Sequence, residues 1–232
     1  MIKAALEYLV NLGKTEVLEV DGQKYSTKGL HHITQPSPDN LVITTLTGLV
    51  DYIISKIDDH KTSLLMQVVS PKQVRVYSPL KPDAIRDYYI ECTAQLPDIC
   101  FGKFIDIENF NIMLQSCFVQ NEHSASVLQV VGNITEQTVR TVGDDGVSQE
   151  VTARAGIVKV TNVPVPNPVI LKPFRTFAEV EQPESKFVFR MQDGPRAAIF
   201  EADGGAWKLE AMRNIKEYLK INLEGCNVKI IS

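Results

Sequence analysis

The sequence of 232 residues lacks the features that would assign it at once to a familiar class of protein. None of its four cysteines lies within two to four residues of another, so it contains neither a zinc knuckle nor a redox Cys-x-x-Cys pair. No window approaches 18 uninterrupted apolar residues, and the N-terminus has no signal-like apolar core. We therefore expect an intracellular protein with reduced thiols and no membrane-spanning helix.

The charge balance is mildly acidic. With 24 basic and 28 acidic residues the net charge is −4, which argues against a broad basic surface that coats nucleic acid. This balance leaves room for a local basic groove. It identifies no partner by itself.

Signatures of catalysis are also missing. The chain has no Gly-x-Ser-x-Gly, His-Glu-x-x-His, Gly-x-Gly-x-x-Gly or phosphate-loop sequence. Its histidines have no cysteine or carboxylate at ligand spacing; they are His31, His32, His60 and His123. The sequence therefore favours a non-enzymatic protein without a cofactor.

What is present indicates an α+β fold with mixed, mostly antiparallel sheets and about four helices. Apolar residues recur at helical spacing in residues 2–12, 44–57, 107–119 and 206–223. Alternating patterns predict strands at 16–20 with 24–26, 64–69 with 73–78, 86–94, and 127–131. In the strand at 86–94 we expect Tyr88, Ile90 and Cys92 on one face and Tyr89 and Glu91 on the other.

The composition changes after residue 120. We predict an α/β region at 1–120 and a β-rich region at 121–232, which together could also form one continuous domain. A hairpin at 134–154, turning at Gly143-Asp144-Asp145-Gly146, is polar on both faces, so we expect it to project into solvent or to pair with another subunit. The proline-spaced segment 163–168 should be extended.

The most distinctive local sequence runs from Phe200 to Trp207, where a strand at 196–200 leads into the helix at 206–223 and then into a strand at 228–231. Gly204 and Gly205 at this structural corner could expose backbone N–H groups to a phosphate. The simpler interpretation is that Asp203 or Gly205 caps the helix and that Trp207 anchors it in the core.

Two further hypotheses concern charged residues near this corner. Four acids, Glu179, Glu181, Glu201 and Asp203, could hold Mg²⁺ or Mn²⁺ in a nuclease-like or phosphatase-like site, with Lys186 as the nearby cation. Three arginines could form an anion-binding site, namely Arg175, Arg190 and Arg196. Ion pairs between neighbouring strands explain the same charges without any ligand.

Two phrases in this region carry a resemblance. The sequence Thr-Phe-Ala-Glu-Val-Glu-Gln-Pro-Glu-Ser at 176–185 and the sequence Phe-Glu-Ala-Asp-Gly-Gly-Ala-Trp at 200–207 resemble an uncharacterised phage and prophage family, the YfdQ-like domain of unknown function. The resemblance is most distinctive over residues 165–222. It implies a phage or prophage gene product in the bacterial cytoplasm, and it brings no activity or catalytic residue with it.

These observations favour a non-enzymatic, homo-oligomeric binding or assembly protein. Its role could be an accessory to phage DNA replication or recombination, or an inhibitor of a host defence component, with a host protein, a phage protein or nucleic acid as partner. A metal-dependent enzyme acting on nucleic acid or nucleotides and a structural component of the virion are the alternatives.

Overall fold

The structure is a computed structural model, and it describes residues 2–20, 23–28, 39–58, 60, 62–81, 84–132, 141–144, 148–155 and 159–232. The chain forms two compact units, Met1–Pro38 and Asp39–Ser232. Asp21 and Gly22, which join the predicted strands at 16–20 and 24–26, lie outside the described residues, as do His31 and His32.

The first unit contains the predicted helix and hairpin, α1 (Ile2–Gly13), β1 (Val17–Val20) and β2 (Gln23–Ser26). The two strands are antiparallel, with Val17 opposite Ser26. No residue of α1 is buried, although the helix carries apolar side chains at Ile2, Leu6 and Leu9. The first unit therefore has an apolar helix without a core beneath it.

The second unit contains the remaining elements. Its helices are α2 (Leu46–Ser55), α3 (Ile107–Ser116), α4 (Glu122–Gly132) and α5 (Trp207–Asn222). Its strands up to residue 120 are β3 (Leu41–Ile43), β4 (Leu64–Ser70), β5 (Gln73–Tyr77), β6 (Tyr88–Thr93), β7 (Ile105–Asp106) and β8 (Phe118–Val119). The later strands are β9 (Thr141–Asp144), β10 (Gln149–Ala155), β11 (Lys159–Pro164), β12 (Val169–Pro173), β13 (Ser185–Gln192), β14 (Arg196–Glu201) and β15 (Val228–Ile231).

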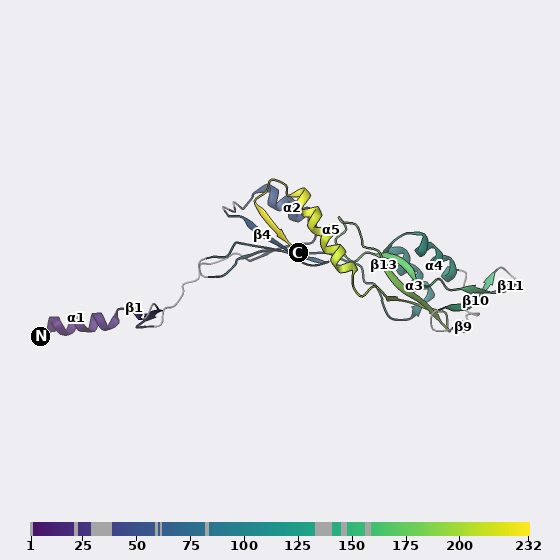
Figure 1. The fold of residues 1–232 in the computed structure, drawn as a ribbon, viewed down its shortest axis with the longest axis horizontal. Coiled ribbons are helices and arrows are strands. Elements are labelled where there is room, and N and C mark those ends of the chain that lie inside the picture. The colour runs from purple at the N-terminus through teal and green to yellow at the C-terminus, as the bar shows by residue number, and fades with distance from the viewer. Residues whose placement is uncertain are drawn as a thin grey trace. The chain divides into compact units, whose positions relative to one another are not determined.

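One five-stranded sheet, here called the first sheet, has the order β15-β4-β5-β6-β3. Its central strands are antiparallel, whereas β15 and β3 join its two edges in parallel. Alternate residues of β4 and β5 are buried, which matches the period of two expected for a strand with one covered face. Helices α2 and α5 lie on the covered face (Figure 1) and contribute Leu49, Ile53, Ile215 and Leu219 to its core.

Helix α2 shows how the sequence sets a boundary. The Thr45 hydroxyl accepts a hydrogen bond from the Gly48 N–H at 3.1 Å, which satisfies one of the free donors of the first turn. A Cβ on Gly48 would lie 2.9 Å from the Thr45 Oγ1, so glycine permits this close capping contact. The helix begins two residues later than the predicted start at residue 44.

The predicted faces of the strand at 86–94 are wrong for Tyr88 and Tyr89. The register of β6 against β5 shifts so that Val76 lies opposite Ile90 while Tyr77 lies opposite Tyr88, which leaves Tyr89 as an extra residue in a β-bulge. The Tyr88 ring consequently stacks on Tyr77, with centroids 5.3 Å apart, on the face away from the helices. A bulge of one residue reverses the faces before it, and periodicity alone does not reveal it.

The second sheet has the order β7-β14-β13-β12-β8 and is antiparallel throughout. On β13, the buried residues Phe187, Phe189 and Met191 alternate with more exposed ones. Helices α3 and α4 pack on the buried face beside β13 (Figure 1), with Phe110 of α3 stacked on Phe189 at 5.6 Å between centroids. We call the opposite face, which carries Lys186, Val188, Arg190, Arg196 and Phe200, the outer face.

Two predictions about this region need correction. The predicted strand at 127–131 is part of helix α4, because Asn121 and Ser124 cap its start reciprocally, each side chain accepting the other's N–H at 2.8 Å. Ser124, Val127 and Val131 then form a buried helical stripe that overrides the strand preference of the valines. The predicted helix at 107–119 ends at Ser116, and the next residues form β8 against β12.

The strands β9, β10 and β11 form a separate antiparallel sheet with β10 in the middle. The predicted hairpin pairs as antiparallel strands, but its predicted turn at 143–146 is wrong, because Gly143 and Asp144 belong to β9 and lie opposite Glu150 and Gln149. Residues 134–140 and 145–147 lie outside the described residues. The base of the hairpin is attached to the second sheet by the buried Gln149, whose amide donates to the Met191 carbonyl at 2.7 Å and accepts from the Met191 N–H at 2.9 Å.

The C-terminal strand–helix–strand unit is present as β14, α5 and β15, but its strands belong to different sheets. The predicted division at residue 120 falls between β8 and α4, inside the second unit. The core of the first sheet contains residues from 46–92 and from 177–223, and the core of the second sheet contains residues from 110–118 and from 127–199. Each core therefore draws residues from both sides of position 120. The chain is an α+β protein with mixed, mostly antiparallel sheets, and the described residues contain five helices. In the described part of the chain, no helix has the length and apolarity needed to cross a membrane.

Candidate functional site

The loop at 174–184, here called the linking loop, connects β12 to β13 and contains most of the first distinctive phrase. Its backbone is held by the buried side chain of Gln182. The Gln182 Oε1 accepts the N–H groups of Arg175 and Thr176 at 3.0 and 3.2 Å, and its Nε2 donates to the Phe177 carbonyl at 3.0 Å. One amide thus satisfies backbone groups that a buried loop would otherwise leave without partners.

The linking loop contacts both halves of the second unit. At its start, the Phe174 N–H donates to the Cys117 carbonyl at 2.9 Å, beside the second sheet. The Thr176 hydroxyl donates to the Pro71 carbonyl, and Phe177 and Val180 are buried in the core of the first sheet. The loop is therefore a structural link between the two cores.

The corner is formed by Arg175 together with the residues around the start of α5. Arg175 is 6% exposed. Its Nη1 donates to the Glu201 carboxylate at 2.7 Å, and its Nη2 donates to the Ser185 hydroxyl. Ser185 in turn donates to the Asp203 carboxylate at 2.8 Å, so a continuous polar network connects the linking loop to the helix.

Trp207 completes the corner by stacking. The Arg175 guanidinium carbon lies 3.9 Å from the centroid of the indole, which is a cation–π geometry. The prediction that Trp207 anchors the helix in the core is not borne out: its side chain is half-buried, it belongs to neither core cluster, and its partner is the buried Arg175 cation at the join between the sheets. Two donors, Arg175 Nε and Trp207 Nε1, are buried and have no acceptor among the described residues.

Electrostatics of the corner follow from burial and hydrogen bonding. Burial lowers the pKa of Arg175 to about 10, although the neighbouring carboxylates of Glu201 and Asp203 favour its charged form. Burial alone would raise the pKa of Asp203. Hydrogen bonds from Gly205, Ser185 and Trp207, with the Arg175 charge, outweigh burial and hold that pKa below its ordinary value. At neutral pH the corner is thus a buried cation between two carboxylates.

The two glycines serve the start of α5. Both have left-handed backbone conformations, with φ of 63° at Gly204 and 82° at Gly205. This turn brings the Gly205 and Trp207 N–H groups to the Asp203 carboxylate at 3.0 and 3.3 Å. Neither predicted candidate, Asp203 or Gly205, is the N-cap residue, which is Ala206 without a side-chain cap. The Asp203 carboxylate nevertheless accepts the N–H of Trp207, the first residue of the helix, and so occupies N–H groups that the phosphate hypothesis requires.

The four acids of the proposed metal site bond to different partners. Glu179 accepts the Thr47 N–H at 3.1 Å in the first turn of α2, and Glu181 pairs with Lys172 at 3.3 Å. Glu201 and Asp203 belong to the corner. Among the described residues, no group of three or more histidine, cysteine or acidic side chains is placed to hold a metal ion.

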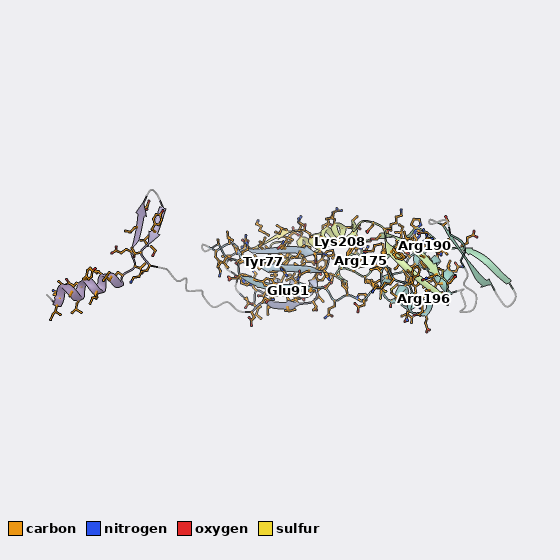
Figure 2. The ribbon with its side chains drawn as sticks, turned by 90° about the horizontal axis from the view of Figure 1, so that it is seen from below. Tyr77, Glu91, Arg175, Arg190, Arg196 and Lys208 are labelled. Carbon is orange, nitrogen blue, oxygen red and sulfur yellow. The ribbon has the colours of Figure 1, made fainter. Side chains whose placement is uncertain are left out.

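The three arginines of the proposed anion site are also separated. Arg175 is buried in the corner, whereas Arg190 and Arg196 lie on the outer face of the second sheet. Figure 2 shows those two side chains on the strands of the second sheet and Arg175 at a different place. The sequence missed the roles of Gln182 in the loop and of Ser185 at the start of β13, because a single buried polar residue has no sequence pattern of its own.

Comparison of the chain with protein-family models, with curated proteins and with solved structures gives no match in any of the three.

Proposed function

We propose that this chain is a non-enzymatic binding protein that holds single-stranded nucleic acid on the outer face of the second sheet. The sequence resembles a phage family. The matching biological role is therefore that of an accessory to phage DNA replication or recombination in the bacterial cytoplasm. The observation that carries the proposal is a row of three cations, Lys186, Arg190 and Arg196, on one face of a chain whose net charge is −4.

The register of the sheet gives the spacing of these cations. Lys186 and Arg190 lie on the same face of β13, and Arg196 of β14 lies opposite Gln192. Arg190 and Arg196 are therefore diagonal neighbours, about 7–8 Å apart at their backbones. The row extends over six residues of strand, or about 20 Å. That length suits several consecutive phosphates of an extended strand.

Aromatic side chains lie beside the cations. Phe200 is opposite Val188 on the outer face, and Phe104 meets it edge to face with ring centroids 6.0 Å apart. Bases stack on such rings with little regard to sequence, while cations neutralise the backbone. Cations combined with rings favour single-stranded nucleic acid over an acidic peptide, which has no bases to stack.

The test is fluorescence anisotropy with a labelled oligothymidylate of about 20 nucleotides, titrated at several salt concentrations. We expect saturable binding by the full chain. The double variant Arg190→Ala/Arg196→Ala should weaken it and reduce the slope of log K against log salt by about 1.4, which corresponds to two lost phosphate contacts. Lys220→Ala/Lys229→Ala removes two exposed charges elsewhere and should leave the slope unchanged.

Three results would overturn this function: no binding at low salt, an equal loss in the control variant, or binding of polyglutamate in place of the oligonucleotide. The circular dichroism spectrum of each variant checks that it is folded.

Self-association is a second proposal, and the apolar helix α1 supports it. Ile2, Leu6 and Leu9 lie at helical spacing and are 80%, 56% and 62% exposed. An isolated helix of 12 residues is marginally stable in water, so α1 requires a surface that covers this stripe. A second copy of α1 would cover it, in agreement with the expected homo-oligomer.

The alternatives have less support. A metal-dependent enzyme needs Glu179, Glu181, Glu201 and Asp203 at one point, and each of them already has another partner. A structural role in the virion is supported by no particular contact in the described residues.

A further inference from the structure

A cavity of about 640 Å³ lies in the second unit where α2 and α5 end and where β4 and β15 begin. No residue of the corner or of the outer face lines it. Its polar lining residues include Tyr52, Lys56, Asp58, His60 and Glu224. The volume falls within the range of about 300–1,000 Å³ that is common for small-ligand sites.

The topology gives this cavity a negative electrostatic potential. Strands β15 and β4 are parallel, and the Leu64 N–H donates to the Asn227 carbonyl at 2.9 Å where both strands begin. The helix that precedes each strand therefore ends at the same place, with Lys56 as the C-cap of α2 and Leu223 as the C-cap of α5. The last carbonyls of a helix lack intrahelical partners, and each helix end carries about half a negative charge.

The side chains add to this potential. Asp58 and Glu224 contribute carboxylates, while Lys56 is the cation among the described lining residues. These three described groups together carry one net negative charge, even before the two helix ends are included. An anionic ligand would be repelled here, whereas a cation would be attracted.

A hydrogen-bonded chain fixes one wall of the cavity. The Tyr52 hydroxyl donates to the Asp58 carboxylate at 2.5 Å, which uses its only hydrogen. Its contact with His60 Nε2 at 3.3 Å must then have the imidazole as donor. Burial, with the hydrogen bond to Asp58, raises the pKa of Tyr52 to about 12, so the phenol keeps its proton at neutral pH.

Aromatic and aliphatic groups form the remaining wall. The His60 ring packs on Tyr89 with centroids 4.8 Å apart and lies 6.3 Å from the Tyr52 ring. Leu64 and Val228 supply apolar surface beside them. An organic cation gains from such rings through cation–π attraction and from the aliphatic surface through burial of its carbon chain.

From this geometry we propose that the cavity binds an alkylammonium group, with its charge at Asp58 and Glu224 and its carbon chain against Tyr52, Leu64 and Val228. The ammonium can belong to a free amine or to a lysine side chain of another polypeptide. The proposal is independent of the outer face and of nucleic acid.

The experiment titrates the ¹⁵N-labelled full chain with n-butylammonium and, separately, with Nα-acetyl-lysine N-methylamide, and follows backbone amide shifts. We expect saturable shifts at Gly225, Asn227 and Val228 with at least one of these probes. Response to the free amine alone assigns the site to small amines, and response to the lysine derivative alone assigns it to a peptide. Neither neutral 1-butanol nor butyrate should produce these shifts.

Variants locate the charge. Asp58→Asn should weaken binding about fivefold, as for the loss of one partly exposed ion pair. Asp51→Asn, an exposed acid on α2 that does not line the cavity, is the matched control and should bind as the unchanged chain does. If Asp58→Asn loses the dispersed spectrum of a folded protein, Glu224→Gln gives the same readout.

Three outcomes would overturn the proposal. They are the absence of saturable shifts with both cations, equal shifts with 1-butanol, and equal binding by the folded Asp58→Asn or Glu224→Gln variant.

Discussion

The guanidinium carbon of Arg175 lies 3.9 Å above the indole of Trp207, and this contact joins the loop between β12 and β13 to the first turn of α5. Helix α5 then packs on the first sheet through Ile215 and Leu219. The stacked pair therefore lies where the chain passes from one sheet to the other. The most distinctive local sequence of the chain thus coincides with this passage between the sheets.

We expect Arg175 and Trp207 to be energetically coupled. A double-mutant cycle of Arg175→Met and Trp207→Leu, followed by urea unfolding, should give a coupling energy of about 1–2 kcal/mol, because the cation is largely desolvated. The control cycle replaces Arg175→Met by Arg213→Met, an exposed arginine on α5, and should give coupling near zero. Coupling near zero in both cycles would contradict a structural role for the stack.

Asp203 should make stability depend on pH in the acid range. Its folded pKa is held below its unfolded value of about 3.9, so its contribution is complete above that value and is lost as pH falls through the folded pKa. Asp203→Asn should lower the free energy of unfolding by about 1 kcal/mol at pH 7, as for loss of a helix cap. The difference from the unchanged chain should shrink as the pH falls below the unfolded value of about 3.9.

Thermal or urea unfolding at a series of pH values measures this difference. Asp51→Asn, at an exposed position of α2, serves as the control for a change of net charge. A difference for Asp203→Asn that stays constant from pH 7 to the acid limit would mean that the Asp203 charge plays no part in the cap.

Helix α1 should mediate self-association. Leu6→Glu/Leu9→Glu places two charges in the apolar stripe, and each lost leucine contact is worth about 1.5–3 kcal/mol. The association constant should fall by at least about a hundredfold. Sedimentation velocity over a range of protein concentrations measures it. The polar-face variant Lys3→Glu/Asn11→Glu should associate as before. Self-association through α1 would be refuted if the unchanged chain were monomeric at every concentration.

The local sequence pattern was sufficient to predict those helices and strands whose partners lie nearby in the sequence. The helix at 2–12, the hairpins at 17–26 and 64–77 and the helix α5 follow from apolar spacing of period 3.6 or 2. Pattern failed at Val127–Val131, where the reciprocal cap of Asn121 and Ser124 makes a helix from a valine-rich sequence. It also failed at Tyr88 and Tyr89, where a bulge reverses the faces of β6.

The candidate sites show the same limit. The sequence proposed Asp203 or Gly205 as the cap, and the Asp203 carboxylate does accept N–H groups two and four residues further along, because such contacts are local. The sequence analysis grouped four acids that bond to different partners in the fold, namely Glu179, Glu181, Glu201 and Asp203. It also grouped three arginines, of which only Arg190 and Arg196 share a face, while Arg175 is buried elsewhere. Closeness in sequence says little about closeness in space once strands diverge.

By itself, the sequence determined the α+β class, most of the helices and strands, and the local contacts of Asp203 at the start of α5, because these depend on interactions between neighbours along the chain. Only the tertiary structure decided that β14 and β15 join different sheets and that Arg175 is buried beneath Trp207. It also decided that Tyr52, Asp58 and His60 meet Glu224 around one cavity. These relationships bring together residues up to about 170 positions apart, and burial of the two cores, not local propensity, holds them in place.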